Sequence, residues 1–477
     1  MMAPSGALLQ RHETLDVARG VAVLGILWFN IFFFALPFEA MVIPAVWGEW
    51  NTLNDLTWDS VTILVAGVMR GMFSILFGAS ALLLLAKAER LLHPADAIDA
   101  YFRRLIWLII IGALHAYLLL WPHDVLYAYG ILGMLVFPFR HARPKTLIIF
   151  ATIALIGSTI FTGQNVEELG KAREEVREVL PEEKRERLRE ADPLVDELGS
   201  TDGFEAPDFM LTANAGDEDA GGENAGGTEN APSSENADYE AFLNILAAKM
   251  TAKQQGYLSN LKDLAPESFE QQTTEMITNH LLDIGAFLLF GMALFKLGFL
   301  TGEWSTASYW KVALAGYLVG VSVGVISRLD APEGTVLGDL SAFASQYTFD
   351  LRRFSLALAN FALIALWVRS GGWSWLRTRL RACGRMALTL YLSQTIVCNF
   401  IFLGYGLSQF AQLEHHEIAV MAVVLSVVQL AAAPIILSRW KQGPLEAALR
   451  RLITIGSRRD VPDAPETVHG GHSARTT

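Results

Sequence analysis

Residues 417–438 read EIAVMAVVLSVVQLAAAPIILS, and their only charged side chain is the glutamate at the start. A helix rises about 1.5 Å per residue, so a run of this length covers roughly the 30 Å of a hydrocarbon bilayer. Similar runs recur along the chain. The predicted fold class is therefore all-α, a polytopic transmembrane helical bundle. We predict ten spans, at residues 17–38, 60–86, 104–121, 124–140, 146–162, 279–299, 309–328, 353–369, 386–406 and 417–438.

The composition agrees with a membrane protein. Of 477 residues, 52% are hydrophobic and 18% charged, and the mean hydropathy is +0.34. In soluble domains about a quarter of all residues are charged. Two cysteines give neither a disulfide framework nor a zinc cluster, and the acidic pI gives no support to nucleic-acid binding. A Walker loop, HExxH and CxxC are all absent, which argues against an ATP-driven pump or a zinc protease.

Basic residues predict the orientation of the spans. Short loops on one side hold most Lys and Arg, at residues 87–104, 140–145, 369–385 and 439–451, while the alternate loops 39–57, 122–123 and 407–416 hold none. Cytoplasmic loops carry such an excess. Both termini are therefore predicted to face the cytoplasm. Three arginines fall instead on the predicted extracytoplasmic side: Arg328, Arg352 and Arg353.

A long acidic segment interrupts the hydrophobic pattern. Residues 163–277 hold 27 acidic and 10 basic residues, and we predict that they form an extracytoplasmic, largely disordered insert. Within it, 166–190 has the charge spacing of a solvated helix, which Pro181 breaks. Four domains result: a five-span bundle at 1–162, the insert at 163–277, a second bundle of about five spans at 278–440, and a cytoplasmic tail at 441–477.

Ionisable residues at hydrophobic depth are candidate functional residues, because each is costly there unless paired or hydrated. Asp16 and Arg19 are three residues apart and share a helix face, and Gly20 permits close approach of another helix. Two interpretations remain open for this group. It is an ion pair that fixes the first helix, or an anion-binding cluster in which Arg19 meets phosphate.

A histidine lies inside the third predicted span. His115 belongs to GALHAY, and Asp124 begins the returning helix just after the turn WPHD. Imidazole titrates near neutral pH, which suits proton transfer, and a His–carboxylate pair is sterically reasonable here. The alternative is a buried histidine bonded to a neighbouring helix.

Arg70 lies near the middle of the second predicted span, where it requires a carboxylate, an anionic ligand or a route to the surface. Asp283 in the sixth span is a further buried charge. In the ninth span Thr389, Gln394 and Asn399 are spaced for hydrogen bonds between helices.

Three stretches resemble the YeiB-like family of bacterial membrane proteins, which carries a C-terminal domain of unknown function, number 418. They are LDVARGVAVLGILWFN near the start, GALHAYLLLWPHDVLYAYG, and the ending with GRMALTLYLSQTI and SRWKQGPLEAALRRL. The resemblance covers nearly the whole chain apart from the insert. It implies a multi-pass protein of the bacterial cytoplasmic (inner) membrane.

The first spans are also similar to those of membrane acyltransferases, including heparan-α-glucosaminide N-acetyltransferases. This likeness implies transfer of an acyl group from cytoplasmic acyl-CoA, as acetyl-CoA, to an extracytoplasmic or lipid-linked sugar-type acceptor, with membrane lipid as a further partner. The LDxxRG motif carries over to Asp16, Arg19 and Gly20. The family pattern of the acyltransferase-three enzymes places a histidine where Asn30 stands here, so the base must lie elsewhere.

The acyltransferase interpretation then assigns the remaining roles by residue type and depth. His115 with Asp124 is the general base and Asn30 an oxyanion donor, while Arg19, Arg70 and Arg104 neutralise the phosphates of the donor. The alternative function is a proton-coupled transporter or export factor for a small molecule, lipid or envelope polymer, with Arg70, His115, Asp124 and Asp283 as a proton path. No metal is expected, and a homodimer remains open.

Overall fold

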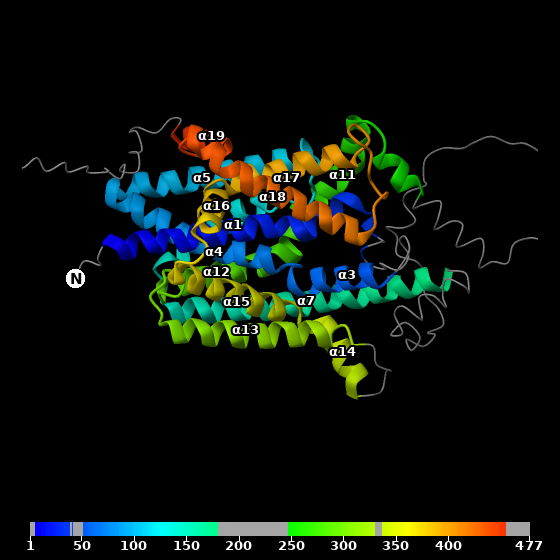
Figure 1. Cartoon of the computed structure of the whole chain (residues 1–477), viewed down its shortest axis with the longest axis horizontal. Coiled ribbons are helices and arrows are strands. Elements are labelled where there is room, and N and C mark those ends of the chain that lie inside the picture. Colours follow the sequence, from blue (N-terminus) through cyan, green and yellow to red (C-terminus); the bar gives the residue numbers. More distant parts are fainter. Residues whose placement is uncertain (1–4, 39–40, 42–50, 180–246, 330–335, 455–477) are drawn as a thin grey trace, which may run out of the picture.

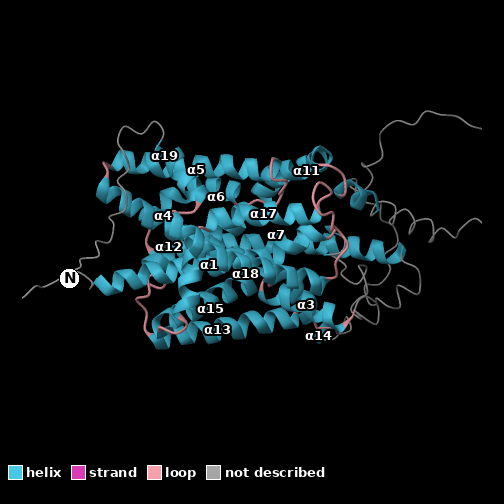
Figure 2. Cartoon of the chain, turned by 45° about the horizontal axis from the view of Figure 1, so that its top comes forward, coloured by secondary structure: helices cyan, strands magenta, loops and turns pink. Residues whose placement is uncertain are grey.

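The computed structural model of the chain describes residues 5–38, 41, 51–179, 247–329 and 336–454. Within these ranges, helices are joined by loops without any strand (Figure 2), and the all-α fold class is confirmed. The helices of the first half are α1 (Ser5–Ala35), α3 (Thr52–Leu64), α4 (Val68–Leu91), α5 (Pro94–Tyr117), α6 (Leu126–Val136), the 3-10 helix η2 (Phe137–His141) and α7 (Pro144–Val179).

The second half begins with a helix that continues into the bundle through a π-helical turn. Its long helices run side by side with those of the first half, and α1 lies among them (Figure 1). The elements are α11 (Tyr257–Gln272), the π-turn η5 (Met276–His280), α12 (Leu281–Lys296), α13 (Thr306–Ile326), α14 (Val336–Tyr347), α15 (Phe349–Ser370), α16 (Ser374–Arg385), α17 (Ala387–Phe402), α18 (His415–Arg439) and α19 (Pro444–Thr454).

Large apolar side chains cover the outside of several helices. Ile153 on α7, Leu318 on α13 and Val420 on α18 are 62%, 71% and 59% exposed, and many neighbours on the same helices are similar. Such continuous apolar surface is unfavourable in water and is what a helix presents to lipid. The fold therefore has the surface of a multi-pass membrane protein.

The count of ten spans remains a prediction. Among the described residues, seven helical stretches are long and apolar enough to cross a membrane. The predicted spans 104–121, 124–140 and 386–406 fall on α5, on α6 with η2, and on α17. These helices are less suited by length or composition, because α5 carries Arg103 and Arg104 and α17 has 16 residues. The seven stretches are Glu13–Ala35, Thr52–Arg90, Pro144–Phe161, Tyr257–Lys296, Thr306–Ile326, Phe349–Ser370 and His415–Arg439.

The second predicted span is broken into α3 and α4. Gly67 precedes α4 in the left-handed conformation, with φ at 72°, which only glycine adopts without strain. The break leaves carbonyl groups of α3 without helical partners, and Arg352 supplies donors to Thr62 O at 2.6 Å and to Ala66 O at 3.2 Å. Arg352 therefore stabilises the break between α3 and α4, and its charge is bound inside the protein instead of being exposed in a loop.

Two of the predicted boundaries differ from the structure. The span 146–162 and the helix predicted at 166–190 are one continuous helix, α7, which extends to Val179. Neither Gly163 nor Gly170 ends it, because a glycine lowers helix stability by only about 1 kcal/mol, whereas proline lacks the N–H group. The disorder predicted for the insert falls mainly on residues 180–246, which lie outside the described residues.

Helix α1 packs most closely against α16. A Cβ atom added at Gly384 would lie 1.8 Å from the carbonyl oxygen of Asp16, and one added at Gly20 would lie 2.0 Å from that of Leu380. Glycine at both positions is what allows the two backbones to touch, as the sequence predicted for Gly20. This contact brings the beginning of α1 against the junction of α16 and α17, where the candidate site lies.

Candidate functional site

A cavity of about 880 Å³ lies between α1, α4, α5, α6, α17 and the C-terminal helix α19. Its lining includes Leu15 of α1 and Leu449 of α19, and the beginning of α1 and α19 both lie toward the left in Figure 1. Five basic side chains line it: Arg19, Lys87, Arg90, Arg104 and Arg385. Its volume falls in the range of sites that hold small molecules and cofactors.

The two inner cations differ in their partners. Arg19 donates to Asp16 at 3.0 Å and to the Ser80 hydroxyl at 3.1 Å, so the predicted Asp16–Arg19 pair is present. Arg104 is half-buried beside Arg19, and the two guanidinium groups repel each other. No ion pair of Arg104 occurs among the described residues. Two like charges at a cavity wall favour an anionic ligand, which would offset their repulsion.

Glu446 is the acidic residue among the lining side chains, and it is already bound. Its carboxylate accepts from the backbone N–H groups of Leu388 and Thr389 at 2.7 and 3.1 Å, and also from the Thr389 hydroxyl. A carboxylate at the first turn of α17 satisfies N–H groups that have no helical partner. It thereby fixes α19 beside the cavity and leaves the lining strongly cationic.

The interior of the cavity is apolar and aromatic. Phe73, Phe77 and Leu108 line it, and Tyr129 and Tyr391 contribute the hydroxyl-bearing rings. Tyr129 stacks on Phe77 with centroids 4.8 Å apart. The cavity therefore suits an amphipathic molecule, with an anionic group at the basic end and an apolar arm in the interior.

A buried histidine lies directly behind Tyr391. His115 Nδ1 is 2.6 Å from Asp124 Oδ1, and its Nε2 is 2.8 Å from the Thr395 hydroxyl. The other oxygen of Asp124 accepts from Tyr127 N at 2.8 Å. The Tyr391 ring packs edge-on against the imidazole, with centroids 5.0 Å apart. The His–carboxylate pair that the sequence suggested is thus present, and both side chains are buried.

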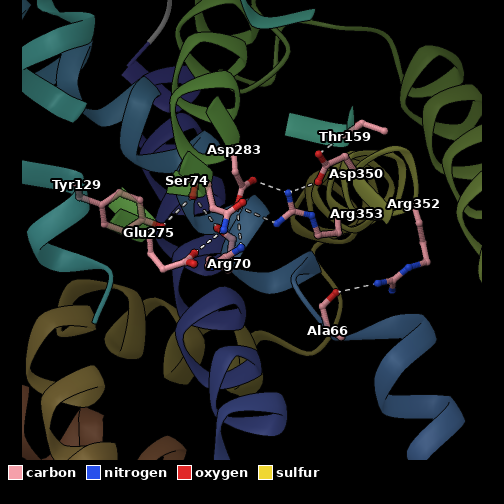
Figure 3. Close-up of polar contacts among 11 residues, drawn as sticks. Ala66, Arg70, Ser74, Tyr129, Thr159, Glu275, Asp283, Asp350, Arg352 and Arg353 are labelled. Carbon is pink, nitrogen blue, oxygen red and sulfur yellow. Dashed lines mark hydrogen bonds and ion pairs between the residues drawn. The ribbon is translucent and has the colours of Figure 1, made fainter. Parts of the chain in front are cut away.

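A second buried polar cluster joins α4, α12 and α15 (Figure 3). Asp283 accepts from Arg70 at 2.7 Å and from Arg353, which also binds Asp350. The side chain of Arg353 is only 1% exposed, and Thr159 Oγ1 donates to Asp350. Paired in this way, two arginines and two carboxylates form a neutral group that holds the helices in register.

The structure places the predicted site residues in separate groups. Arg19 and Arg104 line the cavity, whereas Arg70 belongs to the cluster around Asp283 and is absent from the lining. Asn30 is half-buried in α1 and is likewise absent from the lining. Among the described residues, no hydrogen bond joins Asn30 to His115, whose ring nitrogens contact Asp124 and Thr395.

Sequence reasoning missed Thr395 altogether. The residue stands in the ninth span among ordinary helix-packing side chains, and only its contact with His115, 280 positions away, marks it. Gln394 and Asn399 form the expected hydrogen bonds between helices, with Val23 O and Leu119 O. Arg385 was noted for orientation alone, although it lines the cavity.

These features define the class of protein to which the chain belongs. The described chain is an α-helical, multi-pass membrane protein with an amphipathic cavity and two buried polar clusters. No solved structure matches it.

The comparisons with known proteins show that the chain is similar to YeiB-like proteins. Residues 294–456 match the family described as "Protein of unknown function (DUF418)". The chain is 24% identical over 456 residues to the uncharacterized protein YeiB of Escherichia coli, covering 93% of this chain and 96% of that protein. It is 23% identical over 468 residues to the uncharacterized protein YxaH of Bacillus subtilis, covering 92% of both. The predicted relation to acyltransferases has no counterpart among these matches.

Proposed function

We propose that this protein transfers an acyl group from acyl-CoA to a hydroxyl or amine of a sugar-type acceptor that is extracytoplasmic or lipid-linked. The observation that carries the proposal is the cavity. It combines a basic end and an apolar interior, and the interior ends at the Tyr391 ring that covers His115.

The donor would bind with its phosphates at the basic end. Arg19 and Arg104 would hold phosphate oxygens inside the cavity, and Lys87, Arg90 and Arg385 are exposed at its edge. Guanidinium groups match phosphate geometry and bind it through charge-assisted hydrogen bonds. We place this end in the cytoplasm, with both termini, because the basic loops lie there by the positive-inside rule.

His115 would serve as the general base. Asp124 holds its Nδ1, which fixes the imidazole orientation and stabilises the cation that forms when Nε2 takes a proton. In the overall reaction the acceptor O–H or N–H bond and the thioester C–S bond break. The acyl carbon forms a bond to the acceptor, and the proton reaches the CoA thiolate through His115.

The transport alternative assigns Arg70, His115, Asp124 and Asp283 to one proton path. In the described chain these residues fall into two clusters, and no hydrogen bond joins Asp283 to the His115–Asp124 pair. Asp283 is held by ion pairs with two arginines, so it is already engaged in joining helices. Both observations favour catalysis over transport.

Ligand-dependent stability of the purified full chain tests the donor site. We expect CoA and acetyl-CoA to raise the melting temperature in a saturable manner, and pantetheine, which lacks the phosphates, to have little effect. Arg104→Gln should weaken CoA binding about 10- to 150-fold, as expected for the loss of one or two charged hydrogen bonds.

Arg381→Gln is the matched control, because Arg381 is an exposed arginine of α16 that does not line the cavity. Equal CoA binding by both variants, or no stabilisation of the wild type at millimolar CoA, would contradict the donor site. Substrate accumulation in vesicles would then be the next measurement, because it reports transport.

A further inference from the structure

The hydrogen-bond partners of the two ring nitrogens of His115 determine which proton this side chain can accept. An ionised carboxylate can only accept, so Asp124 Oδ1 requires the imidazole N–H on Nδ1. The neutral ring then has one acceptor, Nε2, and the Thr395 hydroxyl lies 2.8 Å from it and donates. The first proton within reach of this base therefore belongs to Thr395.

The three side chains have the arrangement of an activated nucleophile. Nucleophilic catalysis requires a hydroxyl within about 2.6–3.2 Å of a base that a third group orients. Thr395, His115 and Asp124 meet this requirement, and all three are buried. The second hydrogen bond of Asp124, from Tyr127 N, fixes the carboxylate as well.

Thr395 also lies between the cavity and the opposite end of the bundle. Tyr391, one turn earlier on α17, belongs to the cavity wall and contacts His115. Asn399, one turn later, binds Leu119 O in the loop that follows α5. The Tyr391 ring thus contacts both the cavity and the imidazole that binds Thr395, and its displacement would open the cavity toward this hydroxyl.

We propose that Thr395 is an acyl-carrying nucleophile, so that the transfer occurs in two half-reactions. This inference rests on the function proposed above. It answers a geometric difficulty of that function, since a donor entering from the basic end and an acceptor entering from the opposite end need not be bound side by side.

The chemistry of both half-reactions balances. In the first, Thr395 Oγ1 attacks the thioester carbon, its proton passes to His115 Nε2, and the C–S bond breaks with that proton going to the CoA thiolate. In the second, an acceptor hydroxyl or amine attacks the threonyl ester and gives its proton to Nε2. The ester C–O bond then breaks, and the proton returns to Thr395 Oγ1.

Trapping of the acyl-enzyme tests the inference. The purified full chain is incubated with acetyl-CoA labelled in the acetyl group, without any acceptor, and is denatured before counting. We expect label to approach about one acetyl group per chain with matching CoA release, as for other covalent intermediates. Peptide mass spectrometry should find the acetyl mass on Thr395. The label should survive neutral hydroxylamine, because oxygen esters resist it and thioesters do not.

Four variants separate a covalent role from a structural one. Thr395→Val keeps the shape of the side chain without the hydroxyl and should lose the label, whereas Thr395→Ser should keep it. His115→Ala should lose the label as well. Cys398→Ala is the matched control, since Cys398 is a fully buried nucleophile three residues further on the same helix, and this variant should keep the label. The melting temperature of each variant in detergent shows that it is folded.

The outcomes distinguish this inference from the function on which it rests. Label on folded Thr395→Val, or hydroxylamine-sensitive label that Cys398→Ala removes, overturns the role of Thr395. If CoA stabilises the wild type but acetyl-, butyryl- and palmitoyl-CoA leave no label, the covalent step is wrong while the donor site stands. If CoA does not stabilise the wild type at all, the proposed function itself fails.

Discussion

Asp283→Asn removes one negative charge from a cluster that is neutral in the wild type. Asp283 binds Arg70 at 2.7 Å and Arg353 as well, and Asp350 would remain as the single carboxylate for two arginines. The amide keeps the shape of the side chain but donates where a carboxylate accepted. We therefore expect a large loss of stability with an unchanged fold.

The magnitude follows from burial. Arg353 is 1% exposed, and breaking a buried ion pair costs about 3–5 kcal/mol, because the remaining charge stays desolvated. Arg70 keeps 33% of its side chain exposed, so its share of that loss is small. Asp59→Asn is the matched control: Asp59 pairs with Arg328 at 3.4 Å, and both side chains are more than a third exposed. We expect it to cost about 0–1 kcal/mol.

Equilibrium unfolding in mixed detergent micelles, followed by tryptophan fluorescence, measures both free energies. In a double variant, Arg70→Gln should recover about 1 kcal/mol of the loss caused by Asp283→Asn, because it restores the neutrality of the cluster. Equal losses for Asp283→Asn and Asp59→Asn would refute the reasoning, as would a double variant less stable than Asp283→Asn alone.

Three further predictions concern packing and reactivity. Gly384→Ala should strongly lower the melting temperature, because the added Cβ would lie 1.8 Å from a backbone oxygen of α1. Gly285→Ala should be neutral or stabilising, because its added Cβ would meet open space beside the helix, and equal melting temperatures would contradict the close contact at Gly384. Burial raises the pKa of the Cys383 thiol to about 12, so the reactive thiolate is scarce at pH 8. In a Cys398→Ala background, maleimide should therefore label only the denatured protein, and rapid labelling of the native protein would disprove this. Glu446→Ala should lower the free energy of unfolding by about 1 kcal/mol, because the hydrogen bonds at the first turn of α17 are lost. An unchanged free energy of unfolding in the same assay would show that those bonds contribute nothing.

The fold class was predictable because span length and the absence of charge are local properties of the sequence. Gly67 lies within the second predicted span, and a glycine at this position is a local signal for the break between α3 and α4. Arg352 and Arg353 stood out in the sequence as exceptions to the positive-inside rule, but their binding partners could not be predicted. Arg352 binds backbone carbonyls and Arg353 binds buried carboxylates, so both satisfy their charge inside the protein instead of in a loop.

The candidate site was predicted in part. His115 and Asp124 are nine residues apart, so a turn between two helices was enough to suggest their contact. Thr395 and Arg385 were not recognised, because their roles depend on contacts with helices far away in the sequence. Arg70 was given a ligand-binding role because its partner lies 213 positions later, and no local pattern links the two.

That separation has a consequence for biogenesis. Arg70 leaves the ribosome 213 residues before Asp283, a delay of roughly 10–40 s at ordinary rates of synthesis. During this interval α4 contains an arginine that costs about 2.5–3.5 kcal/mol at the centre of a bilayer. The partner that neutralises Arg70 therefore becomes available only after Asp283 of α12 has been synthesised.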